Sequence, residues 1–185
     1  MKIGVISDTH GDTLAWQKAL KLFEGARFVL HSGDVLYHGV FNPILSSYNG
    51  KRLAEMLNDS PVPLIFARGN CDSDVDQLAL QYPITSLVTE TVIEDLSILI
   101  HHGDKFSNEE LADKYKPDII ISGHTHVYGI EQYKNTIFLN PGSASLPKNP
   151  EKTPTIAVIE GEVIKILSLD AGIEIATSPL RGSSQ

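Results

Sequence analysis

Five short apolar segments, each followed at once by residue types that bind metal ions, constrain this chain more than any other feature. The segments are 5–10, 29–34, 65–70, 99–103 and 119–126. An apolar run that stops at a turn is typical of a buried strand. In the last segment His124 and His126 are two residues apart. Side chains of an extended chain repeat every two residues, so we expect both imidazoles on the same side. We infer that the five strand ends converge on one site.

The first half of the chain alternates between strands and helices. Strands are predicted at 2–7, 28–31 and 64–67, and helices at 13–25 and 50–58, with a long loop at 36–49. Asp12 or Thr13 can cap the first helix. This alternation favours a parallel sheet with covering helices.

The second half is rich in strands. They are predicted at 85–93, 96–102, 118–122, 128–133, 136–139, 155–160 and 163–169, with one helix at 108–115 that can start from Ser107. Short turns at 94–95, 134–135 and 161–162 make most of these strands antiparallel. Both halves are satisfied by an α/β fold, a four-layer α-β-β-α sandwich of two mixed β-sheets flanked by helices. We expect one domain over residues 1–177 and a polar C-terminal tail at 178–185.

Composition narrows the function classes. Hydrophobic residues make up 42% of the chain, enough for a real core, and the longest apolar runs fall far short of the ~18 residues of a membrane span. The single cysteine, Cys71, excludes an internal disulfide and fits a reducing, cytoplasmic environment, and the first residues lead straight into a strand without a signal-peptide pattern. The net charge is −8 with no basic cluster, which argues against binding of duplex nucleic acid. Two divalent cations would bring this charge to −4, with the added charge in one cleft.

The residues at the strand ends form a mixed nitrogen and oxygen ligand set. Such a set suits Mn²⁺, Zn²⁺ or Fe²⁺, whereas calcium would require more oxygens. Seven ligands are too many for one open metal site and suit two sites that share a bridge. Asp34 is the natural bridge because a carboxylate has two oxygens. The candidate ligands are Asp8, His10, Asp34, Asn70, His102, His124 and His126.

The charge of such a site indicates its substrate. Two carboxylates against two divalent cations leave a net positive site that attracts an anion, and phosphate oxygens can bridge both ions. Metals about 3.5–4 Å apart can clamp the attacking and leaving oxygens of an in-line displacement, and they lower the pKa of bound water towards ~7. The residues therefore indicate hydrolysis of a phosphate ester by a hydroxide that bridges two metal ions.

The ordered motifs Asp8-x-His10, Gly33-Asp34, Gly69-Asn70-Cys71-Asp72, His102-Gly103 and Gly123-His124-x-His126 resemble the calcineurin-like metallophosphoesterase superfamily. Residues 33–39, 68–77 and 140–143 resemble the small bacterial YfcE-type phosphodiesterases within it. The resemblance implies the α-β-β-α sandwich and two metal ions per chain, most often Mn²⁺, with Zn²⁺, Fe²⁺ or Ni²⁺ as alternatives. By motif, Asp8, His10 and His126 would hold the first ion. Asn70, His102 and His124 would hold the second, and Asp34 would bridge.

Catalytic roles are expected for Asp34, Asn70, Cys71 and His38. Many superfamily members have a histidine at the position of Cys71, where it assists the leaving group. A thiol cannot place a positive charge there, so we expect Cys71 to favour good leaving groups such as aryl diesters. The alternative is a small inert residue beside the site. His38 could reach the substrate from the loop after Asp34 or could simply be solvated.

For the residues next to the candidate ligands, the sequence gives weaker evidence of a role in the site. His101 must point away from His102 in a strand, and His31 is interpreted as a buried supporting residue. Asp72, Asp104 and Arg68 could orient the ligands or form surface ion pairs. Residues 140–143 are read as a shaped turn near the cleft.

The leading interpretation is a metal-dependent phosphodiesterase (EC 3.1.4.-) acting on a small phosphodiester. One alternative is a phosphomonoesterase or nucleotide hydrolase on the same site, which would need more cationic groups. Another is a non-catalytic scaffold of the same fold that binds proteins, as in the related retromer subunit. Such a scaffold could lose ligands without harm, whereas all seven are present here. The loop 36–49 could support a homodimer or homotetramer.

Overall fold

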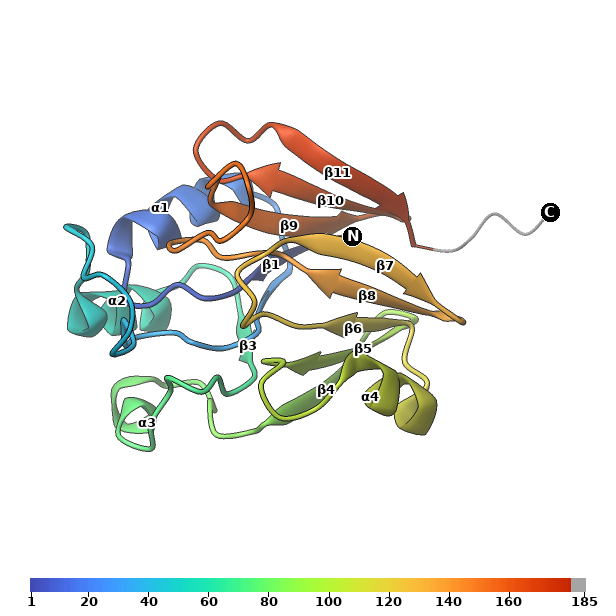
Figure 1. The fold of residues 1–185 in the computed structure, drawn as a ribbon, viewed down its shortest axis with the longest axis horizontal. Helices are drawn as coiled ribbons and strands as arrows, with labels where there is room; N and C mark the ends of the chain where they lie inside the picture. Colours follow the sequence, from blue (N-terminus) through green and yellow to red (C-terminus); the bar gives the residue numbers. More distant parts are fainter. Residues whose placement is uncertain (181–185) are drawn as a thin grey trace.

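The structure is a computed structural model that describes residues 1–180 of the chain (Figure 1). Its elements alternate strand and helix in the first half and are mostly strands in the second. They are β1 (Lys2–Ile6), α1 (Thr13–Leu22), β2 (Phe28–His31), α2 (Gly50–Asn58), β3 (Leu64–Phe66), α3 (Asp76–Ala79), β4 (Val88–Ile93), β5 (Leu96–His101), α4 (Asn108–Tyr115), β6 (Ile119–Ile121), β7 (Gly129–Tyr133), β8 (Thr136–Asn140), β9 (Thr155–Glu160), β10 (Val163–Ser168) and β11 (Glu174–Pro179).

Two mixed sheets form the centre of the molecule. The six-stranded sheet has the order β11-β10-β9-β1-β2-β3, and the five-stranded sheet has the order β4-β5-β6-β8-β7. β1, β2 and β3 pair in parallel, as do β5, β6 and β8. The other pairs are antiparallel. Because the carboxyl ends of parallel strands share an edge, both sheets present the loops after these strands on one side, the left of Figure 1.

Three clusters of buried apolar side chains fill the space between the layers. Alternate residues of one strand face opposite sides, so Leu30 joins the cluster between the sheets, whereas Val29 packs with Trp16 and Leu53 beneath α1 and α2. A third cluster includes Leu111 of α4, which covers the outer face of the five-stranded sheet. The predicted four-layer α-β-β-α sandwich is therefore confirmed.

Helix starts follow the predicted caps. Asp12 Oδ1 accepts hydrogen bonds from the backbone N–H groups of Leu14 and Ala15, at 2.9 and 3.1 Å. Ser107 caps α4 in a capping box with Glu110. In residues 1–180 no helix is both long and apolar enough to cross a membrane.

Two elements of the structure have no counterpart among the predicted ones. α3 has only four residues and no buried side chain. β11 alternates between exposed and half-buried residues, so it lacks an apolar period. Its last residues, Ser178 and Pro179, fall within the predicted polar tail, which is thus shorter than expected because β11 pairs with β10 up to Pro179. The rest of that tail, 181–185, lies outside the described residues.

Candidate metal centre

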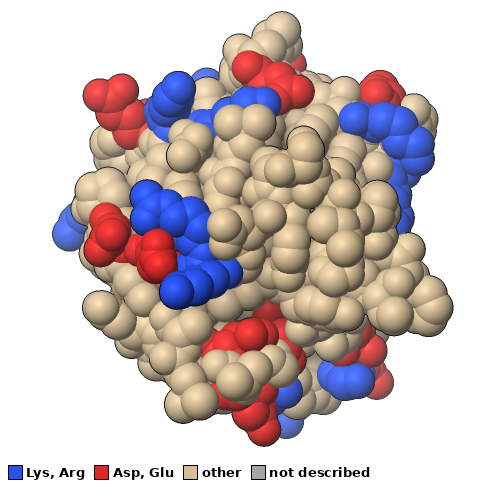
Figure 2. Space-filling model, turned by 90° about the vertical axis from the view of Figure 1, so that its left-hand side faces the viewer, with Lys and Arg blue, Asp and Glu red and all other residues tan. Residues whose placement is uncertain are grey.

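A cleft of about 400 Å³ opens at the shared edge of the two sheets. It contains five of the seven predicted ligands together with Cys71, Lys148 and part of the loop 36–49. Figure 2 shows this side of the molecule, with a broad region free of Lys, Arg, Asp and Glu from the centre to the right of the view, a group of charged side chains to its left and acidic side chains below it. The lining residues are His10, Asp34, Tyr37, Gly39, Val40, Phe41, Asn42, Asn70, Cys71, His124, His126 and Lys148.

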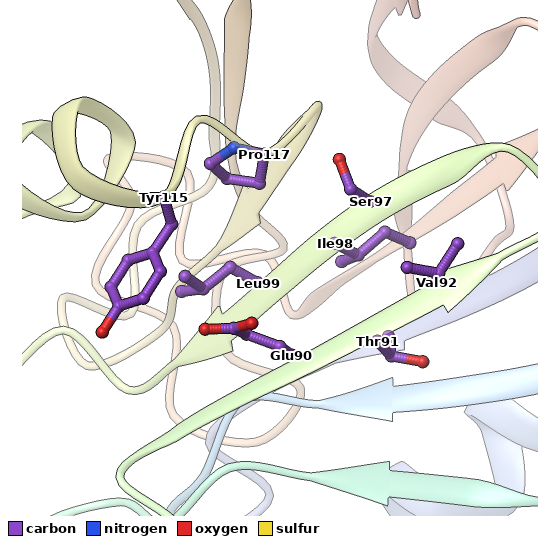
Figure 3. A pocket seen from close by; sticks show the side chains of 8 residues that line it. All are labelled: Glu90, Thr91, Val92, Ser97, Ile98, Leu99, Tyr115 and Pro117. Carbon is purple, nitrogen blue, oxygen red and sulfur yellow. The ribbon is translucent and has the colours of Figure 1, made fainter.

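A second hollow of about 230 Å³ lies between β4, β5 and the end of α4 (Figure 3). Glu90 is the one carboxylate among its eight lining residues, and none of the eight is a histidine. It therefore lacks a ligand set, and the candidate chemistry belongs to the cleft.

Asp8, His10 and His126 form the first group of candidate ligands. Their ligand atoms lie within 4.8 Å of one another, and all three residues are buried. Asp8 Oδ1 is 3.1 Å from His126 Nε2 and 3.8 Å from His10 Nε2, and it accepts no hydrogen bond. Burial tends to raise the pKa of Asp8, but His126 and His102 lower it below its ordinary value. A buried carboxylate oxygen without a donor is a plain sign of a cation site.

The hydrogen bonds of the two imidazoles point to the same conclusion. His10 Nδ1 donates to the carbonyl of Tyr37 at 2.8 Å, and His126 Nδ1 donates to the carbonyl of Leu146 at 2.6 Å. In the neutral rings each Nε2 therefore carries a lone pair, and these two atoms are only 3.4 Å apart. Burial lowers the pKa of His10, which favours its neutral form. Two lone pairs and one carboxylate oxygen facing each other fit a divalent ion.

The second group lies across Asp34. His102 Nδ1 donates to the carbonyl of Ser32 at 2.8 Å, and its Nε2 faces Asn70 Oδ1 at 3.1 Å and Asp34 Oδ1 at 3.4 Å. Burial opposes a charge on His102, but the carboxylates of Asp34 and Asp8 raise its pKa to about 9, so these carboxylates favour a positive charge at this ring. The ring of His124 lies 5.1 Å from that of His102.

Asp34 faces both groups. Its Oδ2 is 3.6 Å from His10 Nε2, and its Oδ1 accepts a hydrogen bond from the Cys71 N–H at 2.8 Å and faces His102. Burial would raise the pKa of Asp34, but the histidines and the Cys71 N–H lower it well below its ordinary value. One carboxylate with an oxygen toward each group is the arrangement that a bridging ligand requires.

The backbone differs from the extended geometry predicted around His124 and His126. Both residues have left-handed φ angles, 66° and 59°, within a tight turn, so the expectation of an extended segment is wrong. The two rings do reach the same cleft, but His126 lies with His10 and His124 with His102. Asp8, His10 and Asp34 also have φ between 44° and 58°. Left-handed non-glycine residues cost roughly 1–3 kcal/mol each and gather at functional sites.

Asp72 holds the two loops of the site together. It is 4% exposed, and its carboxylate accepts the N–H groups of Asp34, Val35 and Gly69 at 2.9, 2.7 and 2.7 Å. These bonds join the loop after β2 to the loop after β3. A methyl group at position 69 would overlap Asp34 Oδ1. Only a glycine therefore lets the backbone at this position lie so close to Asp34.

Cys71 lines the cleft, and His38 does not. Burial, followed by the nearby Asp34, raises the pKa of the Cys71 thiol to about 12, so it stays neutral. The ring centroid of His38 lies 4.5 Å from that of Tyr37 and 5.1 Å from that of Tyr48, and His38 is not among the residues that line the cleft. The cause is the fold of the loop, whose aromatic residues enclose the imidazole.

The structure also defines the contacts of the other residues that the sequence singled out near the ligands. His101 points away from the cleft, and its Nε2 lies 2.7 Å from Asn108 Oδ1. His31 is buried, and Arg68 pairs with Asp74 while its Nε donates to the Asp72 carbonyl. Asp104 Oδ2 lies 3.3 Å from Lys105 Nζ, as an ion pair. In the turn 140–143, Ser143 Oγ donates to the Asp8 carbonyl at 2.8 Å.

Sequence reasoning did not assign the other cleft residues to the site, namely Tyr37, Gly39, Val40, Phe41, Asn42 and Lys148. None lies at a strand end, so the pattern that located the ligands could not find them. The one sequence signal for Tyr37, Val40 and Phe41 is the presence of large apolar residues in the otherwise polar loop 36–49, and Lys148 has no such signal.

Comparisons with known proteins agree with this geometry. Residues 1–162 match the calcineurin-like phosphoesterase superfamily domain. The chain is 35% identical over 172 residues to the protein named phosphodiesterase YfcE of Escherichia coli K12, covering 92% of this chain and 93% of that protein.

Solved structures share the fold. The structure of YfcE, described as a phosphoesterase from E. coli, has a TM-score of 0.90 and 33% identity, covering 98% of this chain and 100% of that one. The structure of vacuolar protein sorting 29 from Cryptosporidium parvum has a TM-score of 0.70 and 19% identity, covering 98% of each chain. At that identity the likeness concerns the fold alone.

Proposed function

Since this chain belongs to the calcineurin-like phosphoesterase superfamily, we propose that it is a metal-dependent phosphodiesterase that uses two divalent ions. The observation that carries the proposal is the position of Asp34, whose two oxygens face two separate groups of ligand atoms. The name of its E. coli relative, a phosphodiesterase, supports the choice of reaction.

In this proposal Asp8, His10 and His126 would hold the first ion. Asn70, His102 and His124 would hold the second, and Asp34 would be the ligand shared between them. When bound, the ions supply a hydroxide for in-line attack on phosphorus and positive charge against the phosphate oxygens. The donor set mixes imidazole and oxygen ligands without a thiolate, which suits Mn²⁺, Zn²⁺ or Fe²⁺, and Mn²⁺ is our leading choice because the resemblance to the superfamily implies it most often.

The protein's own residues set the geometry of the reaction. The carbonyls of Tyr37, Ser32 and Leu146 fix the ring orientation of His10, His102 and His126. The buried left-handed turns place carboxylate oxygens of Asp8 and Asp34 3.1 to 3.8 Å from the imidazole Nε2 atoms of His10, His102 and His126. Cys71 contributes a neutral thiol to the cleft, so the chain offers no cationic acid at that position, which favours esters with good leaving groups.

The alternatives have less support. A nucleotide hydrolase would gain from several cations, and Lys148 is the one Lys or Arg among the described residues lining the cleft. A protein-binding scaffold is suggested by the fold of vacuolar protein sorting 29. A scaffold would not need buried lone pairs and an unpaired carboxylate oxygen to face each other.

The test is hydrolysis of bis(p-nitrophenyl) phosphate by metal-free protein to which Mn²⁺ is added back. We expect turnover that chelator abolishes and that Asp34→Asn lowers by at least about 100-fold, because the bridge is lost. Asp74→Asn is the matched control, since that side chain is 89% exposed and, within residues 1–180, forms an ion pair with Arg68 alone. Stoichiometric metal without turnover of any phosphate ester would favour the scaffold.

Other expectations remain proposals. We propose that residues 1–177 fold as one domain, that the protein is cytoplasmic given its single Cys71, and that its partner is a small phosphodiester rather than duplex nucleic acid or a membrane. Self-association as a dimer or tetramer is tested by light scattering at several protein concentrations.

A further inference from the structure

One wall of the cleft is apolar and exposed. It is formed by Val40 and Phe41 together with Tyr37, all in the loop after β2. Phe41 is 98% exposed and Val40 is 74% exposed. Large apolar side chains grouped on the rim of a site, rather than scattered singly, indicate a surface that binds something.

The position of this wall is tied to the ligands. The Tyr37 carbonyl accepts the hydrogen bond from His10 Nδ1. Asn42 Nδ2 donates to the His38 carbonyl at 2.9 Å and closes the turn that carries Phe41. A methyl group at Gly39 would lie 3.2 Å from Cys71 Sγ, so the loop packs directly over the cleft. The wall is therefore held at a defined place relative to the proposed metal ions.

The charge of the cleft limits what can lie against this wall. Of the described lining residues, only Lys148 carries a positive side chain. The proposed ions can neutralise one phosphate, and little positive charge is left for a second. The volume of about 400 Å³ exceeds what a phosphate group alone requires and lies in the range of small-molecule sites.

We propose that Phe41, with Val40, forms a subsite for an apolar and preferably planar ester group of the phosphodiester substrate. The inference rests on the proposed function and adds the substrate class, a diester with one phosphate and an aromatic or similarly flat arm. The ring of Phe41 stacks on that arm while the phosphate lies at the ions. Aromatic pairs of this kind gain free energy beyond the area that they bury.

Binding of two hydrolysis-resistant probes tests the subsite. Phenylphosphonate and methylphosphonate present the same phosphorus group to the ions, and only the first carries a ring. By calorimetry on Mn²⁺-loaded protein, we expect phenylphosphonate to bind about tenfold more tightly, a ratio typical of one aromatic contact. Phe41→Ala should reduce this preference to under about threefold, and Phe41→Trp should keep it.

Ile44→Ala is the matched control, because Ile44 is 66% exposed on the same loop and does not line the cleft. It should leave the preference unchanged. Equal binding of both probes by the wild type, or an equal loss of both in Phe41→Ala, would overturn the subsite. If both Phe41→Ala and Ile44→Ala reduced the number of chains per assembly while the preference for phenylphosphonate stayed unchanged, the wall would be assigned to self-association. That result would also overturn the subsite.

The same samples separate this inference from the proposed function. Hydrolysis of bis(p-nitrophenyl) phosphate by the wild type, together with a failed probe preference, rejects the subsite alone. Absence of hydrolysis and of binding by either probe rejects both proposals.

Discussion

Asp72 offers the sharpest test of how the site is built. Its carboxylate accepts three buried N–H groups, from Asp34, Val35 and Gly69, and these donors have no other partner in the described residues. In Asp72→Ala all three donors would lose their acceptor, and the loops after β2 and β3 would lose their link. Hydrogen bonds to a charged group contribute about 1.5–3 kcal/mol each, although such losses are not additive.

Two effects offset part of that loss. Water can enter the space left by the carboxylate. Burial, with the charge of Asp34, raises the pKa of Asp72 to about 6, so holding the carboxylate ionised already costs stability above that pH. We therefore expect Asp72→Ala to lower the free energy of unfolding by about 2–4 kcal/mol at pH 8, and the Tm by about 5–15 °C. Asp72→Asn keeps one acceptor oxygen for these N–H donors, so its free energy of unfolding should fall by about half as much.

Urea unfolding of chelator-treated protein measures these differences in the free energy of unfolding without a contribution from metal binding. Because Asp34 also loses its support, calorimetric Mn²⁺ titration should show affinity about 10–100-fold weaker in Asp72→Ala. Asp74→Ala, on the exposed Asp74 of the same loop, should change stability by under about 0.5 kcal/mol. The reasoning would be refuted by an Asp72→Ala protein within about 1 kcal/mol of the wild type.

Three further outcomes follow from the same contacts. His31 donates from Nε2 to Thr9 and accepts the Gly33 N–H at Nδ1, and burial lowers its pKa to about 3. Since this lies below the ordinary value of 6.5, stability is lost as the pH falls, by about 1.4 kcal/mol from His31 between about pH 7.5 and 5.5 in metal-free protein. His31→Gln should lose that part of the urea-monitored pH dependence, and an unchanged slope would contradict it. Cys71→His should raise the ratio of alkyl to aryl diester turnover about tenfold, and an equal ratio in both enzymes would remove the leaving-group idea. Gly123→Ala should weaken Mn²⁺ binding at least about tenfold in calorimetry, because the added methyl would lie 2.7 Å from Asp8 Oδ2; unchanged affinity would show that the turn can adjust.

The strand pattern carried most of the fold prediction. Buried strands such as Ile119–Ile121 are continuous apolar runs, and parallel pairing brings their carboxyl ends to one edge, so the meeting of Asp8, Asp34 and His102 was accessible from sequence. β11 was not accessible, because its residues are mostly exposed and repeat no apolar period.

The details of the site depended on backbone conformations that sequence does not reveal. The left-handed geometry of His124 and His126 replaced the predicted extended segment, since non-glycine residues adopt it only where surrounding contacts hold them. The packing of His38 against two tyrosine rings, and the position of Phe41 in the lining of the cleft, arise from the folding of the loop 36–49. Its pattern has no period that could have indicated which side chains face the cleft.

The number of Mn²⁺ ions held per chain tests the central claim most directly. Metal-free protein should be saturated with Mn²⁺, passed through a desalting column and analysed for metal and protein. The account predicts two ions per chain in the wild type and a loss of at least one in Asp34→Asn, because Asp34 faces both ligand groups. One ion or none in the wild type, or two that persist in Asp34→Asn, would contradict a pair of sites joined by this carboxylate.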